Sequence, residues 1–93
     1  MIAELFLANV PFDASETEVR DFVRESGALV SRVRMITDFG SEKFRGFCFV
    51  DVDVKGGPDE LEECRRFLFG RELKGRPIHV EESRNPRRSR RPD

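Results

Sequence analysis

The 93-residue sequence contains few of the residues that build catalytic, metal or disulfide sites. It has one histidine, two cysteines, and neither tryptophan nor tyrosine. No further ligands cluster near Cys48 or Cys64, which excludes a cysteine-based metal site. Both cysteines fall at predicted core positions, which favours buried free thiols over a disulfide. His79 has no nucleophile pattern near it, so the sequence predicts a residue on a sheet surface and not a catalytic base.

Long apolar runs and targeting signals are also missing. No run approaches the ~20 residues of a membrane span. The start of the chain lacks the basic region and apolar stretch of a signal peptide. We therefore expect no membrane partner and a cytoplasmic protein that stays in the compartment where it is made. The length allows one small domain, predicted at residues 1–83.

Enzyme signatures are absent as well. A small βαββαβ domain could be an acylphosphatase-like hydrolase, but the sequence has no phosphate loop built around a catalytic arginine and asparagine. Glycine-rich phosphate motifs of the nucleotide-binding kinds are missing too. The sequence therefore predicts no catalytic residue, no metal and no cofactor.

Charge is plentiful and unevenly distributed. Residues 84–93 carry a net +4 from five arginines and one aspartate, whereas residues 1–83 carry a net −5. The last ten residues include two prolines and no apolar side chain. We expect this tail to be disordered when free. Its arginines, Arg87 and Arg88 among them, are candidates for a phosphate-binding arm, and the alternative is a solubilising terminus.

Local patterns predict two helices and four strands in the order βαββαβ. Ser15 and Glu18 form a capping box at the start of the first helix, and Gly27 ends that helix. Pro58 suits the first turn of the second helix, which Gly70 ends. The elements are predicted at residues 5–10, 16–26, 30–37, 45–52, 58–68 and 77–82, with a hairpin loop at 38–43.

The most informative segment is the predicted third strand. Because side chains alternate along a strand, Arg45, Phe47 and Phe49 share one face, and the small or apolar residues between them point to the core. The predicted first strand likewise separates Phe6 from its apolar neighbours. Soluble sheets usually turn polar residues to water, so adjacent exposed phenylalanines need a reason. One reason is a surface on which unpaired bases stack while an arginine contacts phosphate.

These two segments resemble the signatures of the RNA recognition motif family. The family has a hexapeptide on its first strand and an octapeptide on its third, which begins with Arg or Lys, then Gly, then an aromatic residue. Residues 45–49 fit the octapeptide, with Cys48 in a small-residue position. Val52 departs from the usual aromatic residue at the last position. The resemblance covers residues 4 to 83 and implies an α+β, ferredoxin-like fold, a four-stranded antiparallel sheet backed by two helices.

The resemblance also implies roles for individual residues. Phe6 and Phe49 would each stack one base, and Phe47 would pack against the sugars between them. Arg45 would contact phosphate, although a salt bridge with a surface acid is the alternative. Arg34 is expected on the same face as the rings. The remaining RNA-contact candidates are Asn9, Lys43, His79, Arg87 and Arg88.

Some positions keep two interpretations. Asn9 either recognises a base edge or holds the turn before Pro11. Glu4, Asp51 and Glu81 are expected on the ring face, where they either read donor groups on bases or lower the affinity for RNA.

The predicted function is binding of single-stranded RNA by a monomer, without chemistry. The alternative is a protein-interaction module of the same fold. Such a module would use the ring face or the second helix, where Phe67 and Phe69 extend beyond the apolar stripe.

Overall fold

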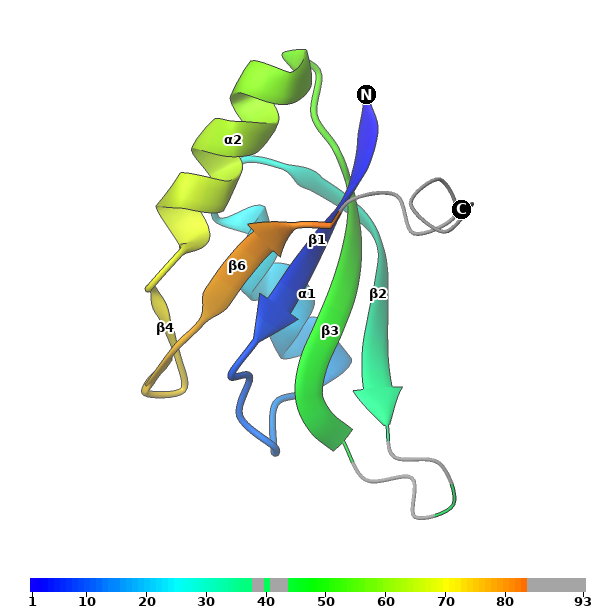
Figure 1. Ribbon diagram of the computed structural model, residues 1–93, viewed down its shortest axis with the longest axis vertical. Helices are drawn as coiled ribbons and strands as arrows, with labels where there is room; N and C mark the ends of the chain where they lie inside the picture. Colours follow the sequence, from blue (N-terminus) through cyan, green and yellow to red (C-terminus); the bar gives the residue numbers. More distant parts are fainter. Residues whose placement is uncertain (38–39, 41–43, 84–93) are drawn as a thin grey trace, which may run out of the picture.

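The structure is a computed structural model that describes residues 1–37, 40 and 44–83, with only the backbone of residues 44 and 45. Its elements are β1 (Ile2–Ala8), α1 (Glu16–Arg24), β2 (Leu29–Thr37), β3 (Phe44–Asp53), α2 (Gly57–Leu68), β4 (Glu72–Leu73), β5 (Arg76–Pro77) and β6 (His79–Glu82). Four strands form an antiparallel sheet in the order β2-β3-β1-β6. The sheet lies in front of α1 in Figure 1. This arrangement is the predicted ferredoxin-like fold. The predicted tail lies outside the described residues, and so does the predicted loop apart from Gly40.

A single hydrophobic core lies between the sheet and the two helices. The sheet contributes alternate residues of its strands, such as Leu5 and Leu7 of β1 and Val50 of β3. The helices contribute their apolar stripes, including Val19 and Leu61. These five side chains are fully buried. A slip of one residue in strand register would turn the buried set of a strand to water, so the core fixes which residues face outward.

The helices begin and end close to their predicted bounds. At the start of α1, the backbone N–H of Glu18 donates to Ser15 Oγ over 3.1 Å, and the N–H of Ser15 donates to Glu18 Oε1 over 2.8 Å. This second hydrogen bond lowers the pKa of the Glu18 carboxyl. The capping box is therefore confirmed. Helix α1 ends at Arg24 rather than at residue 26, and α2 begins at Gly57 and ends at Leu68.

The chain after α2 differs from the prediction. The predicted strand at 77–82 is shorter in the structure, because Pro77 pairs with Glu72 in the β4–β5 hairpin and β6 begins only at His79. The two residues that connect β4 to β5 both have positive φ, 53° at Lys74 and 89° at Gly75. Two-residue hairpin turns require this geometry. The chain therefore makes a small separate hairpin before it returns to the sheet.

Strand β3 has a regular partner on one side and an irregular one on the other. Its pairing with β1 runs without a break from Ile2 to Leu7. Its pairing with β2 shifts register twice, between Val30 and Arg32 and between Met35 and Thr37. The shifts lie at the edge of the sheet, and the central pair that carries the aromatic residues is regular.

Gly46 occupies a position on β3 that has no room for a side chain. Its φ is +87°, and the N–H of Val10 donates to its carbonyl oxygen over 3.1 Å. A Cβ placed on Gly46 would lie 3.2 Å from the Val10 carbonyl oxygen and 3.5 Å from a ring carbon of Phe12. An L side chain there would be both strained and crowded. Gly46 thus lets β3 pass close to the segment after β1, immediately before Phe47.

Candidate nucleic-acid interface

Three phenylalanine rings lie together on the sheet face opposite the helices. Phe6 of β1 and Phe49 of β3 are register partners, with ring centroids 5.2 Å apart and planes tilted by 47°. The rings of Phe6 and Phe47 are stacked, with centroids 5.8 Å apart. Phe47 is 40% exposed, and the other two are half-buried. We call Phe6, Phe47 and Phe49 the ring platform. It presents apolar, flat surface to solvent, as the alternation of the two strands predicts.

Arg34 borders the ring platform on the β2 side. It is the register partner of Phe49, and its guanidinium carbon lies 5.2 Å from the centroid of the Phe49 ring. Its guanidinium also donates to the carboxylate of Glu4 on β1. The Glu4 side chain is only 16% exposed. Arg34 therefore lies on the ring face as predicted, and the Arg34–Glu4 pair offsets an acidic charge there.

The opposite border of the ring platform is formed by β6. Glu81 is the register partner of Phe6, and His79 is the register partner of Ala8. His79 Nε2 lies 2.7 Å from Glu81 Oε2. The ring of Phe69 packs edge-on against the imidazole of His79, with centroids 4.9 Å apart. The sequence predicts Phe69 only as part of a candidate partner surface and gives no sign of this contact, because the contact depends on how the chain returns from α2 to the sheet.

Asn9 is bonded within the protein at both ends of its amide. It follows β1 with a φ of 64°. Its Nδ2 donates to the carbonyl oxygen of Pro77 over 2.8 Å, and its Oδ1 accepts a hydrogen bond from the guanidinium of Arg76. Asn9 therefore has a structural role, which is one of its two predicted interpretations. Its partner, however, is the β4–β5 hairpin and not the turn before Pro11.

Several predicted RNA contacts cannot be placed within the described part of the chain. Lys43, Arg87 and Arg88 lie outside the described residues, and so does the side chain of Arg45.

Among the residues that are described, no group of three or more His, Cys, Asp or Glu side chains could hold a metal ion. None of the helices there is long and apolar enough to cross a membrane.

Both cysteines are free and buried, as predicted. Burial raises the pKa of the Cys48 thiol to about 12. The Cys48 sulfur lies 3.5 Å from the Met35 sulfur. The thiols therefore belong to the core and not to the interface.

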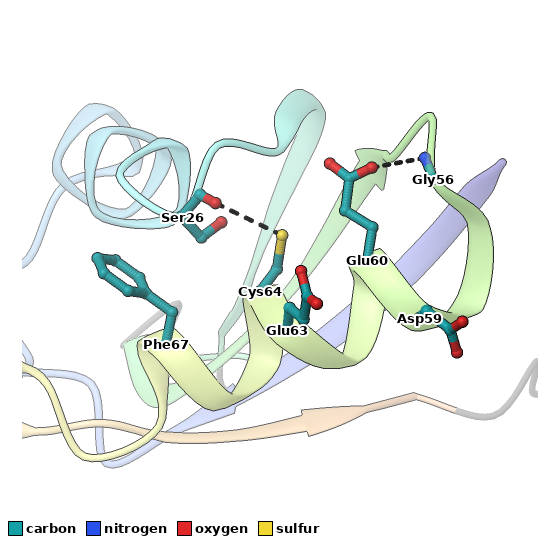
Figure 2. Close-up of a pocket in the computed structure, with 7 residues that line it drawn as sticks. All are labelled: Ser26, Gly56, Asp59, Glu60, Glu63, Cys64 and Phe67. Atoms are coloured by element: carbon teal, nitrogen blue, oxygen red, sulfur yellow. Dashed lines mark hydrogen bonds between the residues drawn. The ribbon is translucent and has the colours of Figure 1, made fainter.

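A second surface feature lies on the helix side of the molecule. Figure 2 shows an open hollow between Ser26, which follows α1, and the side of α2 that carries Cys64 and Phe67. It is lined by Ser26, Gly56, Asp59, Glu60, Glu63, Cys64 and Phe67. Phe67 is 45% exposed, and the guanidinium carbon of Arg71 lies 4.6 Å from the centroid of its ring. The sequence analysis pointed to Phe67 as a partner surface, and the structure leaves its ring accessible.

A comparison with protein families matches residues 5–79 to the model described as RNA recognition motif. Among curated proteins, the chain is 29% identical over 83 residues to a 33 kDa chloroplastic ribonucleoprotein of Nicotiana sylvestris. That alignment covers 89% of this chain and 24% of the relative. The chain is also 29% identical over 80 residues to the human cleavage stimulation factor subunit 2, covering 86% of this chain and 13% of the relative. This chain thus spans about a quarter or less of these relatives.

Solved structures share the fold at low sequence identity. The RNA binding protein PG1 superposes with a TM-score of 0.77 at 23% identity, covering 98% of this chain and 99% of that one. The RNA15 RRM gives a TM-score of 0.76 at 22% identity, covering 94% of this chain and 95% of that one. The second RRM domain of the yeast poly(U)-binding protein gives 0.74 at 17% identity, covering 89% and 95%.

Proposed function

We propose, from the premise that this chain belongs to the RNA recognition motif family, that it binds single-stranded RNA on the ring platform. The family generally binds RNA, through aromatic residues on a four-stranded sheet. The observation that carries the proposal is the grouping of three accessible rings on the face that the helices leave open. The three rings are not part of the hydrophobic core, because the alternate residues of the same strands already fill it.

Stacking supplies the affinity in this proposal. Phe6 and Phe49 each stack one base, and Phe47 packs against the sugars between them. A base stacked on an aromatic side chain contributes ~1–3 kcal/mol and does so for any base, because every base has a flat π face. The mutual contact of the Phe6 and Phe49 rings, at 5.2 Å, holds both rings in place before RNA arrives.

Phosphate contacts come from the basic tail and from two cations of the acidic body. Residues 1–83 carry a net −5, and on the ring face Arg34 is paired with Glu4. The tail, with a net +4, offers its arginines to the phosphates, Arg87 and Arg88 among them. Arg45 and Lys43 add contacts from β3 and the loop before it. Such contacts attract RNA of any sequence, because phosphates carry no base information.

The test substitutes the rings one at a time. Phe49→Ala and Phe6→Ala should each weaken binding to a mixed pool of single-stranded RNA by roughly tenfold to a hundredfold. Each should lower the free energy of unfolding by ~1–3 kcal/mol and leave the domain folded, because each ring is half-buried and belongs to one or two ring pairs. Fluorescence anisotropy measures the first quantity, and urea denaturation followed by circular dichroism measures the second.

Phe67→Ala is the matched control for these ring substitutions. It removes the same side chain from α2, at a position more exposed than Phe6 or Phe49, and RNA affinity should not change. If Phe6→Ala and Phe49→Ala bind RNA as tightly as the unchanged protein, or if the unchanged protein binds no RNA, the proposal is wrong.

A protein partner is the second candidate. It is favoured by the accessible Phe67 ring beside the hollow on α2 and by the exposed Phe69. In that case Phe67→Ala would release the partner and leave the fold intact.

We further propose that the protein acts as a monomer in the cytoplasm. Size-exclusion chromatography tests the oligomeric state, and cell fractionation tests the location.

A further inference from the structure

We infer that Glu81 selects the base that stacks on Phe6, and that the selected base is one with adjacent hydrogen-bond donors, guanine above all. The inference rests on the proposed binding of RNA at the ring platform. It adds the group that reads the base to the rings that hold it.

The position of Glu81 follows from the sheet register. Glu81 on β6 is directly opposite Phe6 on β1, and opposed residues of antiparallel strands have Cβ atoms only ~4.5–5.5 Å apart. A purine is wider than a phenyl ring, so a base stacked on Phe6 extends over a neighbouring strand. On the β3 side, the ring of Phe49 occupies that space, 5.2 Å from Phe6. On the β6 side, the base edge meets the Glu81 carboxylate.

Glu81 is held in place before any base arrives. Its Oε2 lies 2.7 Å from His79 Nε2. The His79 ring is in turn braced by the edge-on ring of Phe69. The Glu81 side chain is still 53% exposed, so the carboxylate is accessible to a ligand. Phe69 and His79 are therefore positioning residues for a carboxylate that faces the ring platform.

The other acids on this face are less suited to reading a base. Glu4 is bonded to Arg34, and its side chain is only 16% exposed. Asp51 is the register partner of Glu4 and not of a ring. Glu81 is the acid that combines exposure, a fixed orientation and a ring as its direct neighbour.

The chemistry of the carboxylate determines the preference. An ionised carboxylate only accepts hydrogen bonds, and it can accept two at once. Guanine offers its N1–H and its amino group side by side. Adenine and cytosine offer an amino group next to an acceptor nitrogen. Uracil offers one N–H between two carbonyl oxygens, which a carboxylate repels. Because hydrogen bonds to an ionised acceptor are the stronger ones, guanine should bind best and uracil worst.

The experiment uses short labelled oligouridine strands with a single central guanine, adenine, cytosine or uracil. Fluorescence anisotropy gives the affinity of the full chain for each strand. The guanine strand should bind roughly tenfold to a hundredfold more tightly than the uracil strand, the range of one bidentate base contact. Glu81→Gln should abolish most of this preference and leave binding of the uracil strand unchanged or tighter.

Glu82→Gln is the matched control. It removes the same charge from the next residue, which is also exposed but is opposite Leu5 and therefore faces away from the rings. The preference for guanine should survive it. His79→Ala should reduce the preference without a comparable loss of binding to the uracil strand, because it frees the carboxylate and removes no stacking ring.

The outcomes separate this inference from the proposed function. If the unchanged protein binds all four strands equally, or if Glu81→Gln keeps the guanine preference, the inference is overturned and RNA binding stands. Loss of the preference in both Glu81→Gln and Glu82→Gln would also overturn it, because net charge would then explain the effect. If the unchanged protein binds none of the strands, the proposed function itself fails.

Discussion

Replacement of Gly46 by alanine tests how β3 is held beside the segment after β1. Two costs add in this variant. The φ of +87° places an L residue in the left-handed region, which costs ~1–2 kcal/mol. The new Cβ would also lie 3.2 Å from the Val10 carbonyl oxygen, so the backbone must move by a few tenths of an ångström. We expect a total loss of ~1–3 kcal/mol in the free energy of unfolding.

Gly27→Ala supplies the matched control for this prediction. Gly27 has a similar φ of +96°. Apart from its chain neighbours, no heavy atom lies within 4 Å of the position that a Cβ on Gly27 would take. It therefore carries the strain without the crowding. For a domain of this size, each 1 kcal/mol lowers the melting temperature by about 4–8 °C. Thermal unfolding should show a larger decrease for Gly46→Ala than for Gly27→Ala.

RNA binding gives a second measurement on the same two variants. Phe47 follows Gly46 directly, so a shift of the backbone there displaces a ring of the platform. Gly46→Ala should weaken RNA binding, and Gly27→Ala should not. Equal stability losses in the two variants would show that the contact with Val10 has no energetic weight. A Gly46→Ala protein as stable as the unchanged one would refute the argument from φ.

Three further predictions concern the tail, the thiols and one surface carboxylate. A chain ending at Ser83 should bind all RNA sequences more weakly by a similar factor, and each lost arginine–phosphate contact should reduce the slope of log affinity against log salt by about 0.7; an unchanged affinity and slope would contradict the arm. Cys48 and Cys64 should resist thiol reagents in the native protein and react after denaturation, whereas rapid native labelling would place a thiol outside the core. A hydrogen bond from Arg65, with a second one from Arg66, lowers the pKa of Glu62 from 4.5 to about 2. Because its pKa is lowered, the ionised Glu62 stabilises the fold through these two arginines above about pH 4.5. This stabilisation is lost as the pH falls toward 2. In an NMR titration the Glu62 midpoint should return toward its ordinary value in Arg65→Ala.

The parts of the fold that sequence reasoning predicted correctly depend on short-range rules. The capping box needs only Ser15 and Glu18, three residues apart, and both of its hydrogen bonds form. The shared face of Phe47 and Phe49 needs only the two-residue period of a strand, which places Cys48 on the other face. These two features require no knowledge of which strand lies beside which, whereas Phe6 joins the ring platform only because β1 pairs with β3.

The features that the sequence analysis missed depend on contacts between distant segments. Asn9 bonds to the carbonyl oxygen of Pro77, 68 residues away in the chain. Phe69 meets His79 only because the β4–β5 hairpin returns the chain to the sheet. That hairpin had a local signal in Gly75, which supplies one of the two positive φ values of its turn. Its strands of two residues were too short for an alternating pattern to reveal them.

The irregular pairing of β2 has a consequence for self-association. Edge strands present unpaired backbone groups, and these can template the addition of a strand from another molecule. The register shifts at Val30–Arg32 and Met35–Thr37 bend this edge away from the flat form that such addition needs. The exposed side chain of Arg32 would also bring like charges together between two copies that paired along this edge. The same sheet keeps three aromatic rings in contact with water, so a straight, uncharged edge would invite fibrous aggregation. The irregular edge of β2 is therefore a poor template for strand addition from another molecule.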